Sequence, residues 1–314
     1  MISQEGKTDN RWYLAKKMPI LRRRAEIIAL IRQFFSDQGY LEVETPCRIP
    51  APAPEAHIDA FRSGDWYLQT SPELCMKRLL AAGYEKIYQI CKCFREGERG
   101  SLHLPEFTML EWYEVGGSCS SLMQNCETMI RSLASRLTLG HNISWNGMNI
   151  PVEPSWGKIA IKDAFALYSP LSLSDALHYN RFDELLAIHI EPKLGWESPV
   201  FLTDYPAPLA ALARIREDDL EWAERFELYI GGMEIANGFA ELTDSREQKI
   251  RFQKENNLRN ALGKAVYPLP GPFLDDLSVM PDCVGIALGL ERLVMLFTGV
   301  SCIDDVVSYT PEML

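Results

Sequence analysis

The order of strand and helix patterns is the feature that most limits what this chain can fold into. Strand patterns recur along the chain with helical patterns before and after them, and residues 225–239 read as a hairpin around Gly231-Gly232. The expected strands are 41–45, 66–70, 86–95 and 106–115, and the expected helices are 18–39, 72–83, 119–139, 244–262 and one after the glycine-rich GIALG. This order favours an α+β fold, an antiparallel sheet flanked by helices, over a doubly wound parallel sheet.

Two stretches fit no regular element. Residues 48–56 read RIPAPAPEA, and their prolines remove donors and bias their neighbours to extended backbone. Residues 140–200 mix short elements with little pattern that points to a function.

Composition is that of an ordinary globular protein. The 314 residues are 47% hydrophobic and 24% charged, and the formal net charge is −11. An acidic chain is a poor candidate for a protein that binds nucleic acid over its whole surface, although a local basic patch remains compatible with it.

Eight cysteines are spread along the chain, and the first twelve residues have no apolar leader. Reduced thiols in a cytoplasmic protein are therefore expected. Cys91 and Cys93 have the spacing of a strand and not of a zinc site, so no structural metal is expected. The late apolar stretch 283–300 contains Glu291 and Arg292 and is too short and charged to cross a membrane.

No phosphate-binding motif of a familiar kind is present. The chain has neither G-x-x-x-x-G-K-[ST] nor G-x-G-x-x-G. A bound nucleotide would therefore not lie on a P-loop or a Rossmann turn.

The strand 106–115 carries polar groups on one face. Alternation places four side chains together: Phe107, Met109, Glu111 and Tyr113. The face is either the solvent side of an edge strand or the floor of a pocket, with a ring to stack on a base and a carboxylate to hold a cation.

The hairpin 225–239 brings two carboxylates together. Pairing directly from its turn places Glu227 opposite Ala236 and Glu234 opposite Tyr229. The two glutamates are then diagonal neighbours, roughly 7–8 Å apart at Cα. They are either a solvated surface pair or ligands of Mg²⁺, which one or two carboxylates hold together with phosphate oxygens.

Regular alternation along the hairpin separates two further polar residues from these glutamates. It places Asn237 and Glu241 on the opposite face, and a β-bulge at Gly238 would return them to the first face.

Two arginines each have the same two possible roles. Arg95 ends a strand and opens a polar loop, and Arg292 lies in the final helix. Each is either a surface charge or a clamp for phosphate or carboxylate.

Taken together, these segments resemble the class II aminoacyl-tRNA synthetases, in particular the lysyl branch. Segments 41–46, 94–113 and 285–292 resemble motifs 1, 2 and 3, and segments 71–73 and 232–244 resemble the lysine pocket. The resemblance divides the chain into an N-terminal extension, 1–17, and a catalytic domain, 18–314, with no anticodon-binding OB-fold. It implies an α+β class II catalytic domain that uses ATP and Mg²⁺ as a cytoplasmic homodimer.

Within that branch, the chain is most similar to the free-standing paralogues that attach (R)-β-lysine to elongation factor P. Ala287 stands where lysyl-tRNA synthetases have Gly and these paralogues have Ala, and its methyl would narrow the pocket near the amino acid backbone. The segments EWY (111–113) and MPDC (280–283) are similar to the same paralogues.

The resemblance also implies roles for individual residues. Arg95, Arg292 and Glu234 are the implied catalytic residues, and Glu227 and Glu234 the implied metal ligands. The implied ATP site is Arg95, Glu96, Gly97, Leu104, Phe107, Glu234, Ile235, Gly289 and Arg292. The implied substrate site is Ser71, Pro72, Glu73, Glu111, Tyr113, Asn237, Glu241 and Ala287.

Within these sets, Arg95 would bind the α-phosphate and the substrate carboxylate, and Phe107 and Arg292 would enclose adenine. The side-chain ammonium of lysine would meet Glu111, Tyr113 and Glu241. The other amino group would meet Glu73, and the carboxylate would meet Asn237.

Two positions depart from the family pattern in motif 2. Gly97 replaces a Glu that helps select adenine, with Glu98 as its candidate substitute, and Leu104 replaces an amide that contacts ATP.

Three functions are compatible with this sequence. The first is ATP-dependent activation of (R)-β-lysine or lysine and its transfer to a lysine of elongation factor P, without tRNA or membrane as a partner. The second is an α-lysine-activating enzyme that acts on tRNA or another acceptor, and the third is a catalytically inactive paralogue.

Overall fold

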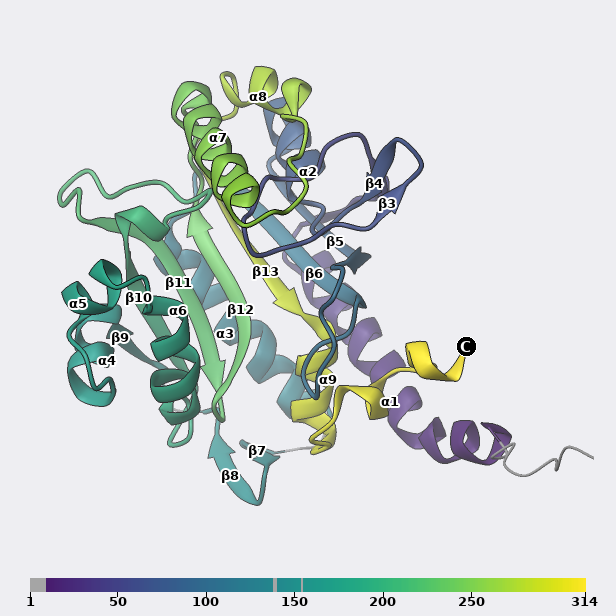
Figure 1. The fold of residues 1–314 in the computed structure, drawn as a ribbon. Coiled ribbons are helices and arrows are strands. Elements are labelled where there is room, and N and C mark those ends of the chain that lie inside the picture. Colours follow the sequence, from purple (N-terminus) through teal and green to yellow (C-terminus); the bar gives the residue numbers. More distant parts are fainter. Residues whose placement is uncertain (1–9, 138–139, 154) are drawn as a thin grey trace, which may run out of the picture.

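A computed structural model describes residues 10–137, 140–153 and 155–314, and it contains the expected antiparallel sheet with flanking helices (Figure 1). The central sheet has eight strands in the order β1-β5-β6-β13-β12-β11-β10-β9. Among the described strands of this sheet, only β1 with β5 and β9 with β10 pair in parallel. The α+β prediction is confirmed.

The central strands come from distant parts of the sequence. Their bounds are β1 Leu41–Glu42, β5 Lys86–Phe94, β6 Glu106–Val115, β9 Gly157–Ala160, β10 Val200–Pro206, β11 Trp222–Ile230, β12 Met233–Ala240 and β13 Cys283–Gly289. A small sheet joins β2 Arg48–Ile49, β3 Arg62–Ser63 and β4 Trp66–Leu68, and a hairpin joins β7 Asn142–Trp145 and β8 Met148–Pro151.

The α-helices lie on both faces of the sheet and around its ends. Their bounds are α1 Asn10–Asp37, α2 Glu73–Ala81, α3 Cys119–Arg136, α4 Ile161–Tyr168, α5 Leu173–His178, α6 Phe182–Leu185, α7 Ser245–Ala261, α8 Gly271–Leu277 and α9 Leu290–Thr298. Within the described residues, none of these helices is both long and apolar enough to cross a membrane.

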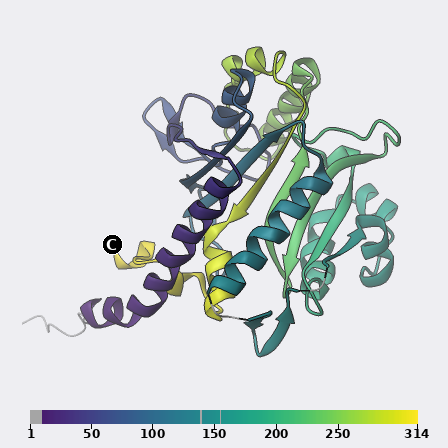
Figure 2. The ribbon, with the colours of Figure 1, turned by 180° about the vertical axis from the view of Figure 1, so that it is seen from behind.

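The main core lies between one sheet face and three helices. Figure 2 shows α1 and α3 across this face, and α9 packs beside them. Ile27, Ile31 and Phe35 of α1 are buried against Leu110 and Trp112 of β6. Since side chains alternate along a strand, the other face of β6 is left for the polar residues.

The structure moves several predicted boundaries. The first helix begins at Asn10 and not at residue 18, so the predicted division at 17/18 falls inside α1. The strand expected at 41–45 is only two residues long, and the irregular stretch 48–56 begins with the short β2. All eight cysteines are free thiols, as predicted.

Candidate active site

Four neighbouring strands supply a row of side chains to the sheet face opposite the main core. Glu111 on β6 lies opposite Ala287 on β13, Ala287 opposite Asn237 on β12, and Asn237 opposite Glu227 on β11. Directly paired residues in a sheet point to the same side. The row therefore brings together polar residues that are far apart in the sequence.

A β-bulge makes this row possible, and it lies at a different residue from the one expected. Tyr229 pairs with Glu234, but Leu228 pairs with Ala236, so Ile235 is the extra residue. The expected pairing of Glu227 with Ala236 and the expected bulge at Gly238 are therefore wrong.

The bulge at Ile235 has the effect predicted for a bulge at Gly238, because it returns Asn237 and Glu241 to the face of the two glutamates. With one residue unpaired, Glu234, Asn237 and Glu241 all lie on the face of Glu227. Gly238 instead points to the opposite face, where a Cβ would crowd the ring of Phe226 and the side chain of Ile286.

A cavity of about 330 Å³ opens on the polar face beside this row. Nine of the residues implied by the resemblance line it: Arg95, Leu104, Phe107, Glu234, Ile235, Asn237, Ala287, Gly289 and Arg292. Residues 96 and 97 do not line it, whereas Glu98 does and lies 3.8 Å from Arg95. The position of Glu98 thus fits the substitute role considered for it.

The two predicted arginines face this cavity and not the surrounding solvent. The guanidinium of Arg95 lies over the ring of Phe107, 5.1 Å from its centroid, and its Nε donates to the carbonyl of Thr70. Arg292 Nη1 donates to the carbonyl oxygen and the carboxylate of Glu234, at 2.8 and 3.0 Å. Both cations are therefore held in place beside the same cavity.

Arg292 also reaches the altered motif 2 loop. Its Nη2 lies 2.6 Å from Nε2 of His103, and burial together with Arg292 lowers the pKa of His103. A neutral His103 that accepts this hydrogen bond links the loop to the final helix.

Glu227 and Glu234 are two carboxylates on one sheet face, and each is paired with an arginine. Burial raises the pKa of Glu227, and the nearby Glu234 adds to this, while Arg225 at 2.7 Å opposes it. Burial also acts to raise the pKa of Glu234, but Arg292, Arg95 and Arg225 outweigh it and the pKa is lowered. Two carboxylates on one face next to a cavity fit Mg²⁺ that is completed by phosphate oxygens.

A second group of polar side chains, mostly buried, surrounds the Glu111 end of the row. Ser71 and Tyr113 each donate a hydrogen bond to Glu111, at 2.8 and 2.5 Å. Glu73 at the start of α2 and Glu241 after β12 both contact Lys77, and the distance from Lys77 Nζ to Glu73 is 2.5 Å. We call Glu73, Lys77, Glu111, Tyr113 and Glu241 the carboxylate cluster.

The carboxylate cluster holds more acidic groups than positive charge. Burial is the largest cause that raises the pKa of Glu111 to about 7, and Glu73 adds to it. Burial likewise raises the pKa of Glu241 to about 8, although Lys77 opposes the shift. A further ammonium group would therefore be stabilised here.

Gly285 lets the cluster form. It lies opposite Tyr113 on β13, and a Cβ at this position would overlap the Tyr113 ring and the Glu241 carboxylate. Any other residue would separate these two side chains.

Two alternatives left open by the sequence are wrong. Strand β6 is not an edge strand, because β5 and β13 flank it, and Glu111 is 2% exposed. The alternative of a solvated surface pair is wrong for Glu227, which is 6% exposed, whereas the side chain of Glu234 is 36% exposed.

Sequence reasoning missed two cations in this region, the buried Lys77 and the half-buried Arg225. Lys77 follows Glu73 by four residues in the same helix, a spacing that brings side chains together. Arg225 precedes Glu227 by two residues in β11, so both lie on one face, and its Nε donates to Asn237. Both spacings were visible in the sequence as charge pairs.

This fold and this site define a class II synthetase catalytic domain. The family model described as "tRNA synthetases class II (D, K and N)" matches residues 11–313, and the chain belongs to this family. Enzymes of this class use ATP.

Among individual proteins, the chain is 39% identical to the elongation factor P–(R)-β-lysine ligase of Salmonella gallinarum over 96% of this chain and 98% of that protein. It is 38% identical to the protein of the same name from Salmonella arizonae, with the same coverage.

Proposed function

We propose that this protein is an ATP-dependent ligase that activates (R)-β-lysine, or lysine, as an aminoacyl-adenylate and transfers it to a lysine side chain of elongation factor P. The observation that carries the proposal is the carboxylate cluster beside an arginine-lined cavity. A diamino acid has two ammonium groups and one carboxylate. The cluster offers acidic partners to the ammonium groups, and the cavity offers arginines to the carboxylate. The names of the Salmonella relatives support the choice of substrate and acceptor.

The reaction requires two anions to meet. The carboxylate of the amino acid attacks the α-phosphorus of ATP, a new C–O–P linkage forms, and pyrophosphate leaves. Arg95 would lie beside both anions and stabilise the charge that develops between them. Arg292 would bind the nucleotide and hold Glu234 in position.

Glu227 and Glu234 would hold Mg²⁺, which supplies charge neutralisation to the phosphates when bound. The reaction needs no covalent intermediate on a protein side chain, because alignment of the two reactants supplies much of the rate enhancement. In the transfer step, the amine of the acceptor lysine attacks the activated carbonyl carbon and AMP leaves.

Ala287 supports (R)-β-lysine over α-lysine as the substrate. It lies in the row between Glu111 and Asn237 and lines the cavity. Its methyl would lie where the backbone of the amino acid binds. It would therefore discriminate between an amino group at the α position and one at the β position. It also disfavours tRNA charged with α-lysine as the product.

Amino-acid-dependent ATP–pyrophosphate exchange tests this proposal, with (R)-β-lysine, α-lysine and no amino acid compared. We expect exchange with (R)-β-lysine above that with α-lysine, followed by transfer of labelled (R)-β-lysine to elongation factor P. Exchange with α-lysine alone would favour another acceptor. No exchange from a folded protein would favour an inactive paralogue.

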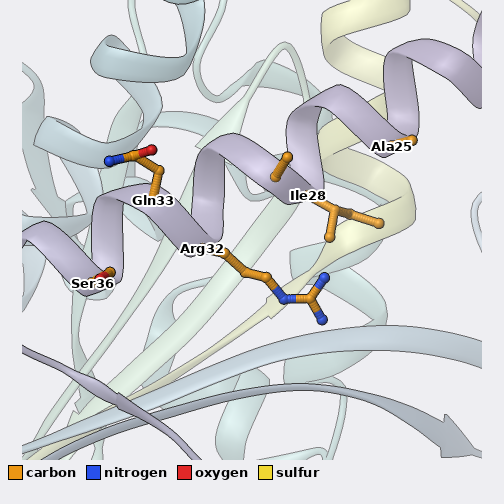
Figure 3. A pocket seen from close by; sticks show the side chains of 6 residues that line it. Ala25, Ile28, Arg32, Gln33 and Ser36 are labelled. Carbon is orange, nitrogen blue, oxygen red and sulfur yellow. The ribbon is translucent and has the colours of Figure 1, made fainter.

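We also propose that the protein is a homodimer joined along α1. The inner face of α1 is buried in the main core, and a hollow follows its outer face, lined by Ala25, Ile28, Ala29, Arg32, Gln33 and Ser36 (Figure 3). A second α1 related by two-fold symmetry would cover this face. The variant Ile28→Glu should sediment as a monomer, whereas Ile250→Glu, a change at an exposed residue of α7, should leave the dimer intact.

The proposed location is the cytoplasm. Eight free thiols fit a reducing compartment.

A further inference from the structure

The side-chain amide of Asn237 faces a cavity that already carries negative charge. Glu55 and Glu234 line this cavity together with Arg95 and Asn237. A further carboxylate binds there only where hydrogen-bond donors point toward it. An amide has two donors at Nδ2 and an acceptor at Oδ1, so its orientation decides whether it attracts or repels the carboxylate of a substrate.

Arg225 fixes the orientation of this amide. Its Nε donates to Oδ1 of Asn237 at 3.2 Å. A guanidinium has donors and no acceptor, so the oxygen of the amide must face it and the nitrogen must face away. Among the residues that the structure describes, none accepts a hydrogen bond from Nδ2 of Asn237. Because Asn237 lines the cavity, its Nδ2 donors are left for a ligand there.

The guanidinium of Arg225 is itself held by several neighbours. Nη1 donates to the carbonyl of Leu209 at 3.0 Å, and Nη2 donates to Glu227 at 2.7 Å. The guanidinium carbon lies over the ring of Tyr205, 4.3 Å from its centroid. All three nitrogens of Arg225 thus donate within the protein, and 17% of its side chain is exposed. These contacts favour a role through Asn237 over direct contact with a ligand.

On the basis of the proposed function, we propose that Arg225 is a positioning residue that turns the donor side of the Asn237 amide toward the carboxylate of the amino acid. Without Arg225, the amide is free to flip and present its oxygen to that carboxylate. Arg225 thereby selects diamino acids over diamines, which have the two ammonium groups but no carboxylate.

The test compares two ligands that differ only in the carboxylate. (R)-β-lysine becomes 1,4-diaminopentane when hydrogen replaces its carboxylate, and lysine with 1,5-diaminopentane forms the matching pair. Affinity for each ligand is measured by calorimetry in the presence of a non-hydrolysable ATP analogue. The variants are Arg225→Met, Arg225→Lys, which keeps the charge, and the control Arg251→Met.

Arg251 is a matched control because it holds a nearby segment in a similar way. Its Nη1 donates to the carbonyls of Ala211 and Ala213, and its Nε donates to Glu247. It lies outside the set of described residues that line the cavity. Its loss therefore removes comparable hydrogen bonds without touching the orientation of Asn237.

For Arg225→Met and Arg225→Lys, we expect affinity for the diamino acid to fall about 10-fold or more, the loss of one hydrogen bond to a charged group. Affinity for the diamine should stay within about 3-fold in the same variants. Arg251→Met should keep both affinities within about 3-fold.

Two changes at Asn237 separate a positioning role from a direct one. In an Asn237→Ala background, adding Arg225→Met should change the affinity for the diamino acid by less than about 2-fold, because the amide through which Arg225 acts is gone. Asn237→Asp leaves Arg225 in place but replaces the Nδ2 donors with an acceptor oxygen. It should weaken binding of the diamino acid by about 10-fold or more and spare the diamine.

Four results would overturn the inference. Equal losses for both ligands would mean that Arg225 supports the structure of the whole site, and no loss for either would remove it from the site. Additive losses in the double variant would mean that Arg225 contacts the carboxylate directly. Unchanged affinity in Asn237→Asp would show that Nδ2 does not face the carboxylate. A wild-type protein that binds neither diamino acid would instead overturn the proposed function, which distinguishes the two failures.

Discussion

The cavity and the carboxylate cluster lie side by side on one sheet face, but they handle charge in opposite ways. In the cavity, Arg95 and Arg292 stand near glutamates and remain accessible from an open space. In the cluster, Lys77 is 1% exposed and is enclosed by Glu73 and Glu241. The cavity is open to a highly charged ligand, whereas the cluster is closed around a cation of its own.

The difference shows what each part can accept. Half-buried arginines that line an open cavity can exchange water for phosphate oxygens, so the cavity suits a large anion such as ATP. The cluster has three carboxyl groups for one ammonium, and burial raises the pKa of Glu111 and Glu241, so the ammonium of a substrate would stabilise their ionised forms. Four changes to the protein test this contrast.

The largest effect is expected in the cavity, for Glu234→Gln. The variant loses a proposed metal ligand and a partner of Arg292, so adenylate formation should fall by about 10²–10³-fold or more. ATP–pyrophosphate exchange at saturating amino acid measures it. Glu184→Gln, which changes an exposed pair with Arg181, should keep the wild-type rate. An unchanged rate in Glu234→Gln would refute the metal role.

The next effect is on stability, in the cluster, for Lys77→Met. Removing the ammonium leaves Glu73 and Glu241 without their cation in a buried site, which should cost about 3–5 kcal/mol of unfolding free energy. The matched change Lys86→Met removes a largely exposed lysine paired with Glu114 and should cost about 0–1 kcal/mol. Urea denaturation measures both, and similar losses would mean that Lys77 is not held by its partners.

The third effect is a pH dependence that belongs to the cluster. Burial raises the pKa of Glu111 to about 7 and that of Glu241 to about 8 from 4.5. The folded chain then keeps protons that the unfolded chain has lost. The stability that these groups provide is therefore complete below about pH 4.5 and is lost as the pH rises through about 7 to 8.

Glu241→Gln tests this dependence because it keeps a neutral group at the same place. Between pH 6 and pH 9, the wild-type protein should lose about 1–3 kcal/mol more unfolding free energy than the variant. Denaturant unfolding at three pH values across this range measures the difference. Parallel curves for the two proteins would show that Glu241 ionises normally.

The smallest effect is expected where the two parts meet, at Ala287. Ala287→Gly removes one methyl from the wall between them and should shift the preference between (R)-β-lysine and α-lysine by about 10-fold toward α-lysine. The ratio of kcat/KM for the two amino acids in pyrophosphate exchange measures it. A constant ratio would show that this methyl does not read the position of the amino group.

Sequence periodicity was sufficient for the parts of the site that depend on one strand. The shared face of Phe107, Met109, Glu111 and Tyr113 follows from alternation alone, and the structure places Phe107 and Met109 in the cavity and the other two in the cluster. The order of elements likewise predicts the fold class. The sequence contained enough information here because each inference used only neighbouring residues.

The remaining features depend on pairing between segments that are far apart. The bulge at Ile235 follows from how β11 meets β12, and no residue type in the hairpin marks it in advance. The position of Glu55 depends on Arg259 and Glu255 of α7, about two hundred residues later. The short β1 and β2 depend on contacts with β5 and β4 rather than on their own pattern.

The extra residue in β12 divides the strand into two stretches that alternate in opposite phase. Before Ile235, the side chains on the face of the cavity have even numbers, as at Glu234. After it, they have odd numbers, as at Asn237 and Glu241. A complete substitution scan of this strand should show tolerance alternating every second residue, with one reversal at 235. Deleting Ile235 would therefore leave a hairpin of regular alternation in which Glu234 and Asn237 still share the face of Glu227, so such a variant should lose the bulge and keep the arrangement of the later side chains.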